Sequence, residues 1–127
     1  MKIVEGLKYT KDHEWVKVDG EKAYIGITDF AQEHLGDVVY VELPEIGISL
    51  EAGGVVSVTE SSKAASDVYT PIEGVVLEVN DMLSENPAKI NEEPYESWIA
   101  VLKINNPSQL NALMDAIEYE KYCAEGE

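Results

Sequence analysis

The sequence predicts a mostly β protein that contains two helices. Most of the 127 residues fall into short runs of β-branched and aromatic residues that glycine or proline interrupts. Only two segments combine a capping residue with helical punctuation or helical spacing of apolar side chains. The length, the 45% hydrophobic content and the lack of a Ser/Pro/Ala-rich linker indicate one domain over residues 1–127.

Seven strands are predicted along the chain. They span residues 14–18, 22–27, 37–42, 54–59, 66–69, 74–80 and 97–104. In the first strand, alternation places Glu14 on the same face as Val16 and Val18, and it places Trp15 with Lys17 on the other face. If the valines face inward, the Glu14 carboxylate is expected at the rim of an apolar face. Such a position indicates either a cleft or a solvated strand end.

Two helices interrupt the strands. The first is predicted to begin after Thr28, which can cap it, and to run through Leu35 with Gly36 as its stop. The second is predicted to begin after Pro107, with Ser108 as its cap. Four apolar residues would then fall at helical spacing on one buried face: Leu110, Leu113, Met114 and Ile117.

A short internal repeat frames the middle of the chain. The segment GVVSV, residues 54–58, recurs as GVVLEV, residues 74–79. Each copy starts with glycine, continues with β-branched residues and follows a turn-forming stretch. The pattern predicts two related β-units that face each other across a connection, and Lys63 lies close to the middle of that connection.

The charge balance disfavours two classes of partner. Acidic residues outnumber basic residues by 25 to 9, which gives a formal net charge of −16. A field of that sign repels phosphate backbones and anionic lipid surfaces, so neither nucleic acid nor a membrane is an expected partner. The charge serves either solubility alone or attraction toward basic protein surfaces.

The chain also lacks the sequence features of secreted, membrane and metal-binding proteins. No apolar run approaches the roughly 20 residues that span a bilayer. The first ten residues, MKIVEGLKYT, show neither a signal-peptide nor a transit-peptide pattern, so the expected location is cytoplasmic, or the mitochondrial matrix if a presequence has been removed. Cys123 is the single cysteine, and His13 and His34 lack paired-ligand spacing, so no metal site is predicted. No catalytic constellation is visible either.

Lys63 is the residue that best indicates chemistry. It lies in the stretch ESSKAASD, residues 60–67, where small serine and alanine side chains leave its ammonium open to an enzyme. A lysine in a polar turn is usually a solvated charge. However, its flexible stem and its amine, once deprotonated, also suit amide formation with a carboxylic-acid cofactor. Lys63 is therefore a candidate for covalent modification.

The stretch ESSKA, residues 60–64, resembles the lipoyl-attachment motif, in which a lysine followed by alanine sits at a β-hairpin tip. It does not resemble the biotin motif, in which methionines flank the lysine. From Tyr9 to Tyr122, further segments are similar, in order, to the H-protein family of the glycine cleavage system. These segments are YTKDHEWV, GITDFAQEHLGDVVYVELPEIG, SSKAASDVYTPIEGVVLEVN, NEEPY and LMDAIEYEKY. One departure is Ser62, where H proteins commonly carry valine, and this difference could alter recognition by a lipoylating enzyme.

The resemblance implies a flattened barrel-sandwich hybrid with a lipoyl-type β-hairpin, a short internal helix and a C-terminal helix. It also implies a shuttle that is not an enzyme and that carries lipoate on Lys63. The arm would take the aminomethyl group of glycine from a pyridoxal-phosphate glycine decarboxylase (P protein) to a tetrahydrofolate-dependent aminomethyltransferase (T protein). Dihydrolipoyl dehydrogenase (L protein) would then reoxidise it, and a lipoate ligase or lipoyl transferase would attach it.

By motif position, the resemblance further implies that Glu14 and Asp67 line the cleft that receives the loaded arm, with His34 nearby. Asp12 occupies a position at which related chains vary. Two other functions stay open. A lipoyl domain of a 2-oxoacid dehydrogenase shares the hairpin motif, although such domains are shorter and usually continue into a linker. An H-like protein that relays lipoate to other enzymes, or that serves a sulfur-oxidising pathway, is also compatible with the sequence.

Overall fold

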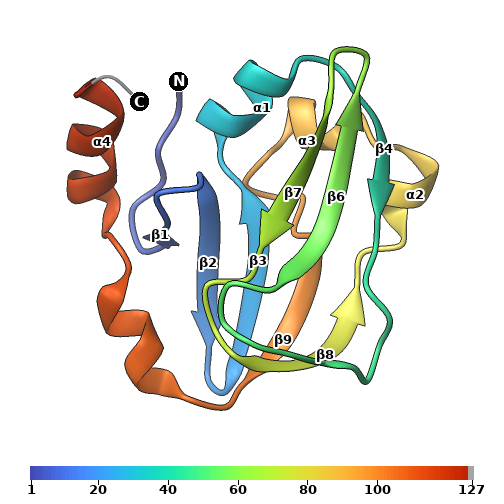
Figure 1. Ribbon diagram of the computed structural model, residues 1–127. Helices are drawn as coiled ribbons and strands as arrows, with labels where there is room; N and C mark the ends of the chain where they lie inside the picture. The colour runs from blue at the N-terminus through green and yellow to red at the C-terminus, as the bar shows by residue number, and fades with distance from the viewer. Residues whose placement is uncertain (126–127) are drawn as a thin grey trace.

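The computed structural model describes residues 1–125, which form a flattened sandwich of two β-sheets with helices at its edges (Figure 1). The strands are β1 (Lys8–Tyr9), β2 (Glu14–Asp19), β3 (Lys22–Ile27), β4 (Val38–Glu42), β5 (Ser49–Leu50), β6 (Val55–Ser61), β7 (Ala65–Tyr69), β8 (Gly74–Val79) and β9 (Ala100–Ile104). The helices are α1 (Asp29–Leu35), α2 (Met82–Glu85), α3 (Lys89–Glu92), the 3₁₀-helix η1 (Pro107–Ala112) and α4 (Ala116–Ala124).

The larger sheet has the strand order β1-β2-β3-β9-β8-β5, and the smaller sheet has the order β4-β6-β7. All pairings between neighbouring strands are antiparallel. The main core lies between the sheets and is built from aliphatic residues of both, such as Ile25, Leu102, Val41 and Val56. The two repeat copies, in β6 and β8, lie in different sheets, as the repeat predicts for facing units.

All seven predicted strands are confirmed: the strand at 22–27 matches at both ends, and the ends of the others agree within three residues. The sequence did not predict β1, β5, α2 or α3. The two strands contain two residues each, too few for alternation to be visible. The two helices contain four residues each and have no side-chain cap. These elements are set by tertiary contacts, since their own residues carry no periodic signal.

The first predicted helix is confirmed in detail. The Thr28 hydroxyl accepts a hydrogen bond from the backbone N–H of Ala31 at 3.2 Å, which caps α1. Gly36 ends the helix with φ of 79°, and its N–H donates to the carbonyl of Gln32. A positive φ is the conformation that glycine adopts without steric cost, so the stop predicted at Gly36 has a direct physical cause.

The second predicted helix was placed wrongly. Residues 107–112 form a 3₁₀-helix that the side chain of Asn106 caps, so Ser108 is not the cap. The chain then extends, because the backbone of Met114 exchanges two hydrogen bonds with Tyr9, at 2.8 and 2.9 Å. The α-helix begins only at Ala116, after a capping box between Asp115 and Glu118.

The four apolar residues that were expected on one helical face therefore belong to different elements. Leu110 and Leu113 pack against the main core, whereas Met114 packs against a second cluster of mainly aromatic residues. Ile117 lies on α4 but is 76% exposed, so it does not face the core.

The first half of β2 is buried on both faces, which simple alternation did not predict. Val16 faces the main core, whereas Trp15 packs in the second cluster with Tyr9 and Tyr119. Gly26 makes this possible, because a Cβ on that residue would lie 2.6 Å from the Trp15 indole. Val16 is fully buried and Val18 is 41% exposed, so the condition that the valines face inward holds for Val16 and not for Val18.

Figure 1 shows the β6–β7 hairpin rising beside α1, while α4 covers the opposite edge near β1 and β2. Within residues 1–125, no helix is both long and apolar enough to cross a membrane.

Candidate functional site

Lys63 lies at the tip of the hairpin that joins β6 to β7, as the sequence predicts. Ser61 organises this tip: its hydroxyl oxygen accepts hydrogen bonds from the backbone N–H groups of Lys63 at 3.1 Å and Ala64 at 3.2 Å. The Ser61 backbone N–H also donates to the Ala64 carbonyl at 2.8 Å. Ser62, Lys63 and Ala64 are all exposed. The tip is therefore a defined turn that presents an accessible lysine.

The Lys63 side chain lies against the end of α1. A Cβ placed on Gly36 would be 3.3 Å from Lys63 Cε and 3.6 Å from Nζ. The absence of a side chain at Gly36 thus leaves the space in which the lysine stem rests. The helix C-terminus is also the negative end of the helix dipole, which favours an ammonium there. This contact brings the lysine beside the helix that forms one wall of a pocket.

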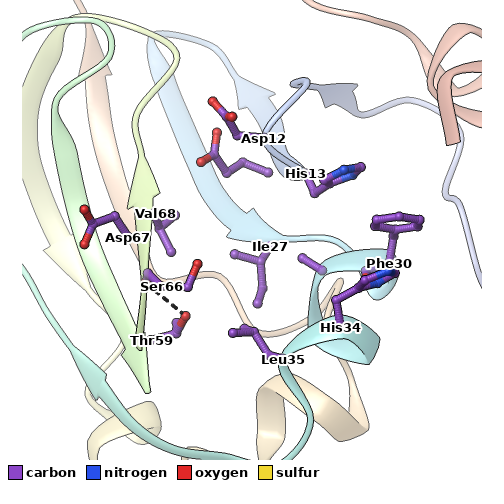
Figure 2. Close-up of a pocket in the computed structure, with 12 residues that line it drawn as sticks. Asp12, His13, Ile27, Phe30, His34, Leu35, Thr59, Ser66, Asp67 and Val68 are labelled. Atoms are coloured by element: carbon purple, nitrogen blue, oxygen red, sulfur yellow. Dashed lines mark hydrogen bonds between the residues drawn. The ribbon is translucent and has the colours of Figure 1, made fainter. Parts of the chain in front are cut away.

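The pocket is a cavity of about 470 Å³ between α1, the turn before β2 and strand β7. Figure 2 shows Phe30, His34 and Leu35 of α1 on one side of this space and Ser66 and Val68 on the other side. The lining residues are Asp12, His13, Glu14, Ile27, Phe30, Ala31, His34, Leu35, Thr59, Ser66, Asp67 and Val68. One side is mainly aliphatic and aromatic, and acidic side chains gather near the start of β2.

Glu14 is buried and lines this pocket, which agrees with the cleft and not with the solvated strand end, the two alternatives that alternation left open. It is 2% exposed and is the one buried charged residue within residues 1–125. Its Oε1 accepts a hydrogen bond from the Thr10 hydroxyl at 2.9 Å, and its Oε2 accepts one from the backbone N–H of Tyr69 at 2.8 Å. Glu14 thereby joins the turn before β2 to strand β7.

Burial raises the pKa of Glu14 from 4.5 to about 7. Loss of hydration is the main cause, because it disfavours the charged carboxylate. The hydrogen bonds from Tyr69 and Thr10 oppose the shift, and the nearby charge of Asp12 adds to it. Glu14 is therefore poised to gain or lose its proton near neutral pH, where a cationic ligand would favour the carboxylate.

This pKa predicts a specific effect of pH on stability. Between pH 4.5 and about 7, the unfolded chain has lost the Glu14 proton while the folded chain keeps it, so this group lowers the free energy of unfolding as pH rises. Glu14→Gln should remove that contribution. The free energy of unfolding of the variant should therefore increase relative to that of the parent as pH rises from 4.5 to about 7. Urea melts at intervals from pH 4.5 to 8 measure the difference, and a constant difference would contradict the pKa.

An aromatic stack forms another part of the pocket wall. The Phe30 ring lies 4.2 Å from the His13 ring and 4.3 Å from the His34 ring, centroid to centroid. His13 has φ of 67°, which is uncommon for a residue other than glycine. In that conformation the His13 ring lies beside the Phe30 ring. His13 also directly precedes the buried Glu14 in the sequence.

The structure brings together most of the residues that the sequence singled out. Glu14, His34 and Asp67 all line the pocket, and Lys63 lies beside α1. His34 is on the last turn of α1, where its Nδ1 lies 3.0 Å from the Phe30 carbonyl oxygen. The Asp67 carboxylate, in contrast, points to the other side of β7 from Ile27 and α1 (Figure 2). Glu14 is thus the acid most directly built into the cavity.

Comparison with known proteins places this geometry in a family. The glycine cleavage H-protein family profile matches residues 7–126. The chain is 58% identical over 125 residues to the glycine cleavage system H protein of Thermoanaerobacter pseudethanolicus, covering 98% of this chain and 99% of that protein. It is 54% identical over 124 residues to the mitochondrial glycine cleavage system H protein of Oryza sativa subsp. indica, covering 97% and 76%.

A crystal structure of a glycine cleavage system H protein from Mycobacterium marinum has the same fold. Its TM-score is 0.81 at 32% identity, with 97% of this chain and 98% of that chain covered. The chain belongs to the glycine cleavage H-protein family. H proteins are lipoyl carriers of the glycine cleavage system and are not enzymes. The flattened β-sandwich that the resemblance implied is thereby confirmed.

The family implies lipoate as the cofactor, and the pocket residues fit such a group. Ile27, Phe30, Leu35 and Val68 offer apolar surface for a hydrocarbon chain and a dithiolane ring. The space over Gly36 already accommodates the aliphatic stem of Lys63. The buried Glu14 carboxyl supplies one polar group that can pair with a cation.

Sequence reasoning missed two residues that build the H-protein site. Phe30 precedes His34 by four positions, and this helical spacing could have indicated that the two rings share one face of α1. Tyr119 carried no such signal, because its partners His13 and Thr28 lie 106 and 91 positions away.

Proposed function

We propose that this chain is the lipoyl-bearing shuttle of a glycine cleavage system and that Lys63 is its attachment site. The observation that carries the proposal is the position of Lys63. It is exposed on a defined hairpin tip, and its side chain lies beside the helix that walls a cavity with a buried carboxyl. We treat residues 1–127 as one lipoyl-carrier domain.

When attached, the oxidised lipoyl group would supply a disulfide that takes the aminomethyl group of glycine on one sulfur, while the S–S bond breaks and the other sulfur becomes a thiol. The protein supplies position and protection. Ser61 holds the hairpin tip, so that the lysine is presented to the lipoate ligase or lipoyl transferase. Tethering would then raise the effective concentration of the lipoyl arm in the active site of each partner.

The pocket protects the cargo between partners. The carried primary amine is cationic near neutral pH, and burying it without a partner would be costly. Glu14 lies within the cavity, where its carboxylate can accept a charge-assisted hydrogen bond from that amine. Phe30 and Leu35 line the same space and reduce the access of water to the carbon that water would otherwise attack.

The partners that we propose are the glycine decarboxylase, the aminomethyltransferase and dihydrolipoyl dehydrogenase, all in the cytoplasm. The net charge of −16 supports recognition by basic surfaces on these enzymes. Three ion pairs form within residues 1–125, involving Glu33, Glu78 and Glu92, so most carboxylates of this region stay available to a partner.

Encounter with each partner should therefore weaken as salt rises. Because the screening length falls from about 8 Å at physiological ionic strength to about 3 Å at 1 M, the apparent KM for the carrier should rise at least about two-fold over that range. The control is free lipoamide as substrate of dihydrolipoyl dehydrogenase, which lacks the carrier's charge. A carrier KM that changes no more than the lipoamide KM would mean that the charge serves solubility alone.

Reconstitution tests the proposed function as a whole. The lipoylated chain, mixed with the decarboxylase, the aminomethyltransferase, the dehydrogenase, tetrahydrofolate and NAD⁺, should release CO₂ and ammonia from glycine in repeated turnovers. The unlipoylated chain is the control. Lipoylation without any glycine turnover would assign the chain to a different lipoyl pathway.

A further inference from the structure

The hydroxyl group of Tyr119 joins two walls of the pocket, which a backbone hydrogen bond of 3.1 Å from the Thr28 N–H to the His13 carbonyl also connects. The first wall is the turn of residues 10–14, which carries His13 and Glu14. The second is α1, which carries Phe30, His34 and Leu35. The Tyr119 hydroxyl oxygen lies 2.7 Å from His13 Nδ1 and 2.7 Å from the hydroxyl oxygen of Thr28, the capping residue of α1.

This hydroxyl extends a continuous chain of hydrogen bonds. The Ala31 N–H donates to the Thr28 hydroxyl oxygen, Thr28 bonds Tyr119, and Tyr119 bonds His13. The Tyr119 hydroxyl can donate to His13 Nδ1 and accept from Thr28, or it can accept from a protonated His13 Nδ1 and donate to Thr28. The tautomer of His13 decides between these two arrangements. A change at Tyr119 therefore reaches both the start of α1 and the residue that precedes Glu14.

Burial and ring stacking restrict the position of the Tyr119 side chain, so its hydroxyl offers a fixed hydrogen-bond partner to both walls. Tyr119 is fully buried, and its ring stacks on Tyr9 with centroids 4.5 Å apart and planes 5° apart. It lies on α4, whose start is set by the capping box of Asp115 and Glu118. The anchor thus comes from the C-terminal helix, outside the pocket and far away in the sequence.

The conformation of His13 makes such an anchor necessary. A positive φ at a residue other than glycine costs free energy and persists where the surroundings hold it. The contacts of the His13 ring include the Tyr119 hydroxyl, the stacked Phe30 ring and the tilted Tyr122 ring. If the ring were released, the adjacent Glu14 and the Phe30 wall would both lose a fixed neighbour.

We propose that Tyr119 is a positioning residue of the arm pocket: its hydroxyl locks the 10–14 turn to α1, so that α4 sets how tightly the pocket retains a loaded arm. This inference rests on the proposed function, since it concerns retention of the arm. Tyr119 does not line the pocket, so it acts through His13 and Thr28.

Tyr9 offers a matched control. It is buried to the same extent, it forms the other half of the stack, and its hydroxyl also makes two hydrogen bonds. Those bonds go to the backbone of Val4, away from the pocket. Tyr9→Phe and Tyr119→Phe thus remove equivalent groups, but only the second removes the hydroxyl that bonds both His13 and Thr28.

The first measurement uses the loaded carrier. Tyr119→Phe should release ammonia about five-fold faster than the parent in the absence of the aminomethyltransferase, a ratio equivalent to about 1 kcal/mol and typical of one lost hydrogen bond. Tyr9→Phe should stay close to the parent. Each variant is assayed at the same number of degrees below its own Tm. If both variants release ammonia faster by the same factor, the cause is a general loss of stability and the proposal is overturned.

The second measurement uses the unmodified chain and needs no lipoate. In Tyr119→Phe, but not in Tyr9→Phe, NMR should show shifted ring-nitrogen resonances of His13 and faster hydrogen exchange at the Ala31 amide. Unchanged signals at both places would overturn the positioning role, whereas failure of lipoylation alone would count against the proposed function. If Tyr119→Phe does not fold, Thr28→Val, which loses the bridging hydroxyl, and Thr28→Ser, which keeps it, replace the pair. Because Thr28→Val also removes the hydroxyl that caps the Ala31 N–H, the readout for this pair is the ring-nitrogen resonances of His13, and equal resonances in the two variants would overturn the proposal.

Discussion

Lys63→Arg is expected to abolish lipoylation of this chain completely while leaving its fold intact. Amide formation requires a deprotonated amine, and the arginine guanidinium stays protonated in proteins. The substitution keeps the positive charge and a long flexible stem on an exposed turn, so no packing is lost. The hydrogen bonds from the backbone of the tip to Ser61 do not depend on the side chain at position 63.

Intact mass after co-expression with a lipoate ligase measures this result. The parent should gain the mass of one lipoyl amide, and peptide mapping should place it on Lys63. Lys17→Arg is the matched control, because Lys17 is also exposed but lies within β2 and not at a hairpin tip. A lipoylated Lys63→Arg sample would refute the assignment of the attachment site.

Glu14→Ala is expected to shorten the lifetime of the loaded carrier about ten-fold, while lipoylation and reoxidation of the empty arm change little. A charge-assisted hydrogen bond contributes about 1.5 to 3 kcal/mol, and loss of about 1.4 kcal/mol corresponds to a factor of ten. Glu14 is buried in the pocket with its carboxyl oriented by Thr10 and Tyr69, so little reorganisation opposes its contact with a cation.

The assay is the rate of spontaneous ammonia release from purified loaded carrier, without the aminomethyltransferase. Asp67→Ala is the comparison, and it should have a smaller effect because the Asp67 carboxylate points to the other side of β7 (Figure 2). Equal decay of the parent and both variants would show that the pocket retains its cargo without these carboxylates.

The dependence of this rate on pH gives a second signature of Glu14. Burial raises its pKa to about 7, so acidification below neutral pH protonates the carboxylate and removes its attraction for the cargo amine. A bound cation lowers this pKa, which moves the effect toward lower pH in the loaded form. The parent should therefore lose cargo faster as pH falls, whereas Glu14→Ala should lack that component.

The sequence by itself determined the features that depend on neighbouring residues. Alternation and turn residues located the seven longer strands, because side-chain direction repeats every two residues in a strand. Thr28 and Gly36 marked the ends of α1, because a cap needs only the residues next to it. The motif around Lys63 similarly placed it at a hairpin tip.

Only the tertiary structure decided how those features meet. The burial of Glu14 depends on an N–H group of Tyr69, 55 positions away, and the start of α4 depends on pairing between Met114 and Tyr9. Trp15 is buried because Gly26 on the adjacent strand has no side chain. The Tyr119 hydroxyl joins His13 to Thr28 across 106 and 91 positions. Periodicity records which face of an element is apolar, but it carries no information about which distant group a buried polar atom will bond.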